Sequence, residues 1–199
     1  MAVANYIVCP SFEHSSWKNA GGQTWSTYEN PNDPSTSITF RRQSGISRTR
    51  GTYALQYIEQ TNILTQVYSY FQLELSLPST STPKTWTFSF DCLRSSTTGQ
   101  AWRLRVFAGG SILATITISS GRNYIRFTQQ PGETYFLFEF VTTLPDVGDR
   151  CEMVIDSLRL CEGTEINYVD GSTAGFIWEG TAHLSRTLSA PSVTYNGVW

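Results

Sequence analysis

The chain has 199 residues, of which 15% are charged, and it carries a formal net charge of −2 with a pI of about 5.7. This length suits one domain, or one domain with an appendage, and needs no metal or disulfide to complete a core. The weak negative charge argues against a nucleic-acid or membrane partner. No apolar run reaches the roughly 18 residues of a membrane-spanning helix.

The N-terminal segment lacks the basic start and the long apolar stretch of a secretory signal. We therefore expect synthesis in the cytoplasm, and for any extracellular role another exit, such as cell lysis. The four cysteines form no C-x-x-C motif and match no zinc-binding spacing. The sequence predicts that they are reduced, buried thiols: Cys9, Cys92, Cys151 and Cys161.

The N-terminal third is the least regular part of the chain. Tyr6–Val8 is typical of a short strand, and 15–37 is rich in loop-forming residues. Within it, Trp17, Trp25 and Tyr28 are candidate carbohydrate-binding residues, because aromatic rings present flat apolar faces to sugar C–H groups. The alternative for Trp17 and Trp25 is that they cap the core.

A basic stretch follows, with four arginines and no acid between Arg41 and Arg50. Its charge favours contact with an acidic glycan or with a neighbouring subunit. The alternative is that it forms the solvent-exposed face of a hairpin. Thr52–Glu59 and Ile63–Leu77 then return to strand-like sequence.

The middle of the chain alternates apolar and polar residues with a period of two, which predicts half-buried strands with one core face. The expected core positions are Phe71, Leu73, Leu75 and Leu77; Trp86, Phe88, Phe90 and Cys92; Trp102, Leu104, Val106 and Ala108; Ile112, Ala114, Ile116 and Ile118; and Phe136, Phe138 and Phe140. Turn-like sequences separate these runs, and Ala108–Ser111 with its two glycines is the clearest hairpin signal. The fold class predicted is all-β, an antiparallel jelly-roll β-sandwich.

Catalytic motifs are absent from the sequence, and we expect no enzyme activity. The two histidines, His14 and His183, have no nucleophile placed with them by spacing alone. Paired carboxylates of the glycoside-hydrolase type cannot be recognised from spacing. Asp91 and Glu139 are acids that we expect on strand faces, where such residues are common.

Four motifs occur in the order typical of the galactose-binding-like jelly rolls of carbohydrate-binding modules, which the chain resembles from about Asn5 to Gly163. They are Pro10–Glu13, Gly51–Tyr57, Trp86–Phe90 and Ile155–Gly163. The resemblance implies that the first and last strands are antiparallel neighbours, which would bring Cys9 near Cys161 as the candidate disulfide.

The same resemblance implies a structural calcium held by Glu13 and Asp156, helped by backbone carbonyls near Gly51. Calcium needs six to eight oxygen ligands, and Ser157 stands where the family has a second Asp. The alternatives are a hydrogen-bonded carboxylate pair or a water in place of the ion.

The tail Tyr168–Ser185 resembles a segment found after such jelly rolls in tail-associated virion proteins of siphoviruses. The positions in register are Asp170, Gly171, Trp178, Gly180, Thr181 and Ser185. This resemblance implies a non-enzymatic bacteriophage virion structural protein, in the tail, fibre or capsid decoration, that is made in the host cytoplasm and released by lysis. Its partners would be other virion proteins, its own subunits in a homo-oligomer, and a host-surface glycan.

We expect two parts, a jelly roll over 1–163 and an extended C-terminal arm over 164–199. Glycine-rich sequence with spaced aromatics can lie extended over a partner, and tryptophan is favoured at interface hot spots. The residues proposed for assembly are Asp170, Gly171, Phe176, Trp178 and Trp199. The arm would pack on a neighbouring subunit or on its own sandwich, and the alternative function is a free carbohydrate-binding module that adheres to polysaccharide.

Overall fold

The computed structural model describes residues 3–7, 10, 12–13, 15–20, 22–27, 37–44, 52–61, 67–144, 146–169, 172–174, 176–178, 182 and 187–189. The strands are β1 (Val3–Asn5), β2 (Asn19–Ala20), β3 (Gln23–Thr27), β4 (Ser37–Ser44), β5 (Tyr53–Gln60), β6 (Val67–Ser76), β7 (Lys84–Thr97), β8 (Arg103–Ala108), β9 (Ser111–Thr117), β10 (Gly121–Gln129), β11 (Tyr135–Leu144), β12 (Arg150–Glu162), β13 (Phe176–Trp178) and β14 (Thr187–Ser189). Within the described ranges, no helix is long and apolar enough to cross a membrane.

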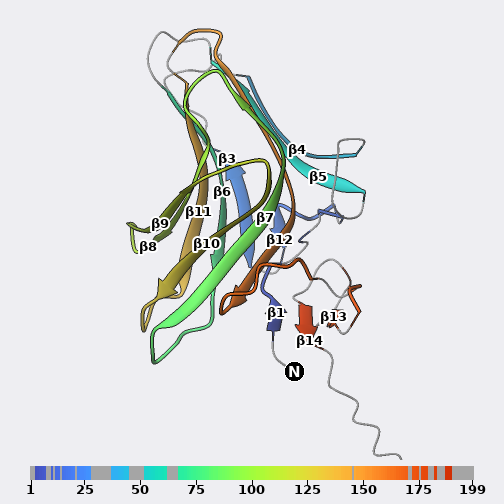
Figure 1. The fold of residues 1–199 in the computed structure, drawn as a ribbon, viewed down its shortest axis with the longest axis vertical. Coiled ribbons are helices and arrows are strands. Elements are labelled where there is room, and N and C mark those ends of the chain that lie inside the picture. The colour runs from blue at the N-terminus through green and yellow to red at the C-terminus, as the bar shows by residue number, and fades with distance from the viewer. Residues whose placement is uncertain are drawn as a thin grey trace, which may run out of the picture.

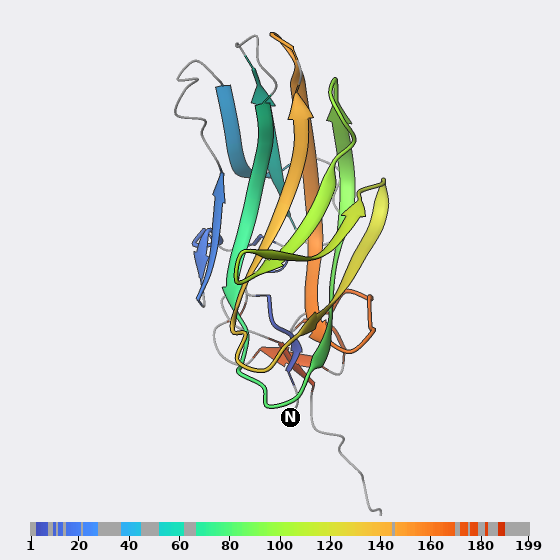
Figure 2. The same cartoon turned by 90° about the vertical axis from the view of Figure 1, so that its left-hand side faces the viewer.

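Two antiparallel sheets pack face to face (Figures 1 and 2). One has five strands in the order β10-β7-β12-β5-β4, and the other has six in the order β2-β3-β6-β11-β8-β9. Most consecutive strands from β5 to β12 change sheet, which is the winding of a jelly roll. The predicted fold class, an all-β antiparallel jelly-roll sandwich, is therefore confirmed.

The period-two pattern assigns the core correctly along the long strands. The expected inward residues of β6, β7, β8 and β11 are all buried. The exceptions are on β9, where Ala114 and Ile116 are only partly buried and Ile112 is 54% exposed. The register between β8 and β9 shifts at Val106/Phe107, so Ile112 pairs with outward-facing Phe107 rather than continuing the inward row.

Aromatic rings fill the space between the two sheets. Phe71 and Phe140 stack with ring centroids 4.6 Å apart and planes inclined by 3°. Phe88 of the opposite sheet approaches Phe138 at 4.6 Å, and Phe90 meets Phe140 edge-on at 5.1 Å. Because these contacts join strands far apart in sequence, they hold the sandwich together as one core.

The hairpin predicted at Ala108–Ser111 joins β8 to β9. Gly109 and Gly110 both have positive φ, 55° and 82°, as a two-residue primed turn requires. Ala108 pairs directly with Ser111 across the turn. This hairpin prediction is confirmed, and it sets the register of β8, which carries two of the site residues described below.

The segment Gly163–Val169, here called the strap, turns back after β12 and lies against the outer face of the five-stranded sheet. Its backbone carbonyls accept hydrogen bonds from side chains of that sheet and of β1. The donors include Thr87 to Gly163 (2.6 Å), Arg122 to Ile166 (2.9 Å), Arg159 to Asn167 (2.6 Å) and Asn5 to Val169 (3.1 Å). The strap therefore covers one half of β12, in which every residue from Cys151 to Cys161 is buried.

The N-terminus and the described part of the arm meet at one end of the sandwich, at the bottom of Figure 1. β1 pairs with β14, and β14 pairs with β13, in a small antiparallel sheet. The segment after β1 continues beside β12, because Tyr6 N donates to Leu160 O at 2.8 Å and Leu158 N donates to Pro10 O at 3.0 Å. These bonds place the start of the chain beside its last long strand.

The described cysteines are free, buried thiols, as predicted: Cys92, Cys151 and Cys161. Cys161, the implied partner of Cys9, donates from Sγ to the Glu165 carbonyl at 3.3 Å. Burial raises the pKa of all three thiols, and that of Cys151 reaches about 12. Cys161 is therefore not held in a disulfide, and Cys9 lies outside the described residues.

Candidate functional site

The outer face of the six-stranded sheet carries the side chains that alternate with the core residues of β6, β11 and β8. The register aligns them in rows across the sheet. One row joins Tyr70, Val141 and Arg103, and the next joins Gln72, Glu139 and Arg105. Tyr68 lies opposite Thr143, one row further toward the end of the sheet.

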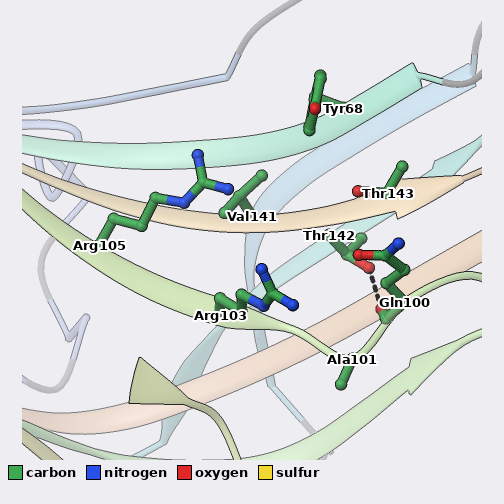
Figure 3. A pocket seen from close by; sticks show the side chains of 8 residues that line it. All are labelled: Tyr68, Gln100, Ala101, Arg103, Arg105, Val141, Thr142 and Thr143. Atoms are coloured by element: carbon green, nitrogen blue, oxygen red, sulfur yellow. Dashed lines mark hydrogen bonds between the residues drawn. The ribbon is translucent and has the colours of Figure 1, made fainter. Parts of the chain in front are cut away.

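A polar pocket of about 130 Å³ opens on this face (Figure 3). It is lined by Tyr68, Gln100, Ala101, Arg103, Arg105, Val141, Thr142 and Thr143. In Figure 3 both guanidinium groups extend from β8 toward β11, with Tyr68 beyond β11 on β6. This volume is well below the roughly 300–1,000 Å³ of pockets that enclose a whole ligand, so the pocket suits a substituent or part of a ring.

Tyr68 forms the aromatic edge of this pocket. Its side chain is 56% exposed, although its neighbours in sequence, such as Ser69 and Phe71, are buried. An aromatic ring left in water on a sheet face loses the favourable burial that most tyrosines obtain. The ring therefore presents a solvent-exposed apolar surface beside a polar pocket.

Arg105 and Glu139 form an ion pair at the inner side of the pocket, with Arg105 NH1 3.4 Å from Glu139 Oε1. Burial raises the pKa of the Glu139 carboxyl, and the positive charge of Arg105 opposes this rise. Glu139 Oε1 is buried and has no hydrogen-bond donor among the described residues. Because this atom is buried and Glu139 does not line the pocket, Glu139 acts by holding Arg105 rather than by contacting a ligand.

The end of the pocket is built by the turn at 98–101, which is fastened to the end of β11. Gln100 N donates to Thr143 O at 3.0 Å, and the Thr142 hydroxyl donates to Gln100 O. Gly99 packs so closely that a Cβ at this position would lie 1.8 Å from Thr143 O. The turn therefore approaches β11 only because residue 99 has no side chain, and this close approach forms the end of the pocket.

The predicted sugar-binding tryptophans lie elsewhere, and this prediction is wrong. Trp17 and Trp25 are only 4% and 3% exposed and belong to the core, where Phe12 packs edge-on against both rings. Their faces are occupied by protein, so they cannot stack on a sugar. The alternative, that they cap the core, is what the structure shows. Tyr28 lies outside the described residues.

The residues proposed for calcium are both engaged by backbone amides. Glu13 Oε1 accepts hydrogen bonds from Thr52 N (2.5 Å) and Tyr53 N (3.0 Å), which holds residue 13 at the start of β5. Asp156 is fully buried, and its Oδ1 accepts from Ser157 N at 2.7 Å. No group of three or more His, Cys, Asp or Glu side chains gathers within the described ranges. A calcium ion at Glu13 and Asp156 stays a prediction.

Of the residues proposed for assembly, Phe176 and Trp178 lie on β13, while Asp170, Gly171 and Trp199 lie outside the described residues. Phe176 is partly buried, and its neighbour Ile177 is 40% exposed. β13 pairs with β14 of the same chain, so the described part of the arm makes contacts within one subunit.

Asp91 and Glu139 lie on the outer faces of opposite sheets. Asp91 belongs to β7 and accepts a hydrogen bond from Arg122 at 3.3 Å, whereas Glu139 belongs to β11. Because the whole sandwich separates them, these two acids do not form a catalytic pair. His14 and His183 lie outside the described residues.

The described arginines of the basic stretch bind within the chain. Arg41 NH2 donates to Gln43 Oε1 at 2.8 Å. Arg42 donates to the Glu13 carbonyl at 2.9 Å and lies 4.2 Å from the centroid of the Tyr53 ring. Both therefore have structural roles on β4.

The site residues Tyr68, Arg103 and Arg105 were not singled out from the sequence, although a signal was present. If Phe71 and Leu73 face inward, Tyr68 must face outward by the same alternation. Arg103 and Arg105 alternate in the same way with Trp102 and Leu104. Which of the outward residues gather around a pocket depends on strand pairing between distant segments.

No family model and no curated protein matches the chain. Among solved structures it is similar to the arabinose-bound α-L-arabinofuranosidase MgGH51, with 11% identity over 82% of this chain and 27% of that one and a TM-score of 0.48. It is similar to tailspike protein 4 of Bacteriophage CBA120, with 11% identity over 79% of this chain and 22% of that one and a TM-score of 0.43. It is also similar to TmCBM61 in complex with β-1,4-galactotriose, with 14% identity over 80% of this chain and 99% of that one and a TM-score of 0.42. The chain thus spans about a quarter of the first two. TM-scores below 0.5 identify neither ligand nor activity.

Proposed function

We propose that this protein is a non-enzymatic carbohydrate-binding jelly roll of a bacteriophage virion, and that it holds glycans on the outer face of its six-stranded sheet. The observation that carries the binding function is the exposed ring of Tyr68 at the edge of a polar pocket. Sugar recognition combines an apolar surface for C–H groups with fixed polar groups for hydroxyls, and this face presents both.

The polar groups of the site suit sugar hydroxyls. Gln100 and Thr143 supply an amide and a hydroxyl oxygen that can accept hydrogen bonds, and the guanidinium groups of Arg103 and Arg105 supply donors. The two arginines project from β8 and Thr143 projects from β11, and the pairing of these neighbouring strands sets the backbone positions of the three residues.

Replacing Tyr68 with alanine is expected to weaken glycan binding about tenfold, because the stacking surface is removed, and each tenfold change corresponds to about 1.4 kcal/mol. The measurement is an array of neutral and acidic polysaccharides, followed by calorimetry on the strongest ligand. Tyr124→Ala is the matched control, since Tyr124 is also exposed but lies on β10 of the other sheet. Equal losses in the two variants, or none in Tyr68→Ala, would contradict this site.

The virion setting rests on the resemblance of the tail to tail-associated virion proteins. A chain that assembles through its arm should change its mass when 171–199 is deleted. We expect the truncated chain to sediment or scatter light as a smaller species, while near-ultraviolet circular dichroism still shows a packed aromatic core. An unchanged mass in the truncated chain would argue instead for the alternative, a free carbohydrate-binding module that acts as a monomer.

A further inference from the structure

We propose that the pocket binds an anionic substituent of the glycan, a carboxylate or a phosphate, and that Arg103 is the residue that contacts it. This inference rests on the proposed carbohydrate-binding function and names the class of sugar that the same site selects. It follows from three observations: the charge of the pocket lining, the lack of a partner for Arg103, and the size of the pocket.

The lining of the pocket is positively charged. Its eight residues include two arginines and no aspartate or glutamate. Glu139 lies next to the pocket and compensates only Arg105, at 3.4 Å. Among the described residues, the positive charge of Arg103 is therefore left without a counter-charge at the pocket, although the chain as a whole is slightly negative.

Arg103 differs from the other arginines that the structure describes. Arg94 and Arg150 pair with Glu152, and Arg122 pairs with Asp91. The remaining described arginines, apart from Arg105 in its pair with Glu139, contact amide oxygens, backbone carbonyls or rings: Arg41, Arg42, Arg126 and Arg159. Within the described ranges, Arg103 alone has no ion pair, hydrogen bond or ring contact.

The spacing of the site suits one sugar ring with a charged group. Tyr68 on β6 and Arg103 on β8 lie two interstrand spacings apart across the sheet and two residues apart along it. With the usual strand dimensions, this offset corresponds to about 12 Å between their Cα atoms. A ring stacked on Tyr68 can then direct its substituent toward the guanidinium. The pocket volume of about 130 Å³ accommodates such a group, and it is too small to enclose a whole oligosaccharide.

The chemistry of the guanidinium favours an oxyanion over a hydroxyl. Arginine donates two parallel hydrogen bonds to a carboxylate or phosphate, and such charge-assisted bonds are about twice as strong as neutral ones. Because Arg103 is solvent-exposed, its attraction for an anion is screened by salt. The expected preference is therefore about tenfold at low salt and smaller at high salt.

The test uses the full-length chain and calorimetry with four probes: polygalacturonate, its methyl ester, neutral β-1,4-galactan, and a ribitol-phosphate teichoic acid. We expect tighter binding, by about tenfold, of a carboxylated or phosphorylated probe than of the uncharged probes. Polygalacturonate and teichoic acid distinguish the two sources of negative charge. Raising the NaCl concentration should reduce the difference.

Arg103→Ala is expected to abolish the preference, so that charged and neutral probes bind with similar affinity, and Arg103→Lys should restore only part of it. Arg126→Ala is the matched control, since Arg126 is exposed on β10 of the opposite sheet. A preference that persists in Arg103→Ala overturns the inference. If only the neutral probes bind, and their binding depends on Tyr68, the inference about an anionic substituent is wrong and the proposed function remains. If no probe binds, both the inference and the proposed function are wrong.

Discussion

Replacing Phe140 with alanine should lower the free energy of unfolding by about 3–5 kcal/mol. Phe140 is fully buried on β11 and contacts rings from both sheets. Its ring stacks on Phe71 at 4.6 Å and meets Phe90 of the opposite sheet at 5.1 Å. Alanine would leave a cavity at the point where the two sheets join, and surrounding rings fixed by their own strands cannot collapse to fill it.

Urea denaturation followed by tryptophan fluorescence measures this effect. Ile112→Ala is the matched control, because Ile112 is also an apolar residue of the six-stranded sheet but is 54% exposed. We expect the control to change stability by no more than about 0.5 kcal/mol. A loss below about 1 kcal/mol in Phe140→Ala would mean that Phe140 is not a central core residue.

Replacing Arg122 with alanine should destabilise the protein by about 3 kcal/mol and release the strap Gly163–Val169. The guanidinium of Arg122 joins three segments: its Nε donates to Ile166 O at 2.9 Å, and its NH1 donates to Ser157 O at 2.6 Å and to Asp91 Oδ1 at 3.3 Å. Without it, the buried carbonyls and the Asp91 carboxylate lose their donor together, and unpaired buried polar groups are costly.

Hydrogen exchange distinguishes this result from a general loss of stability. The amides near the strap should lose protection in Arg122→Ala at denaturant concentrations where the Phe71–Phe140 core remains protected. Arg122→Lys should not restore protection, because one ammonium cannot replace a planar donor to several acceptors. Arg126→Ala removes a single long bond of 3.4 Å to Thr164 O and should leave the strap in place. Unchanged exchange in Arg122→Ala would refute the role given to Arg122.

The strap has a consequence for where the protein can bind a ligand. It covers part of the outer face of the five-stranded sheet, and several polar side chains on the rest of that face are joined to one another. Gln56 Nε2 donates to Glu152 Oε1 at 2.8 Å, and Arg94 pairs with the same oxygen at 3.2 Å. The exposed ring on that face, Tyr124, has Arg126 over it at 4.8 Å from its centroid. Tyr68 on the six-stranded sheet instead borders a pocket whose Arg103 has no partner among the described residues, so this is the face where we expect a ligand to bind.

Some expectations from the sequence were confirmed because they depend on local alternation. The inward rows on β6, β7 and β11 follow from a period of two that each strand shows by itself. The predicted inward position of Ile112 on β9 is wrong, because a β-bulge in the pairing with β8 reverses the alternation of inward and outward side chains. Whether a bulge forms depends on the partner strand. A register shift also occurs in β12, between Asp156 and Arg159, where Ser157 has a φ of 54°.

The aromatic residues show most clearly what the sequence could not reveal. Trp17 and Trp25 occur in a loop-rich stretch, and their composition suits a binding platform as well as a core cap. Only the packing of distant rings, such as Phe71 of β6 against Trp25 at 6.3 Å, decides that they are buried. Tyr68 has the opposite outcome, since it lies on a regular strand and remains exposed.

The sequence by itself therefore determined the all-β class, the inward face of the long strands and the hairpin at Gly109–Gly110, because each depends on neighbouring residues. Only the tertiary structure decided which outward residues meet at a pocket and which of the described arginines lacks a partner. Tyr68, Arg103 and Thr143 come from three strands, and their proximity is a property of strand order and register. That order is set by contacts between segments far apart in the chain, which no local pattern records.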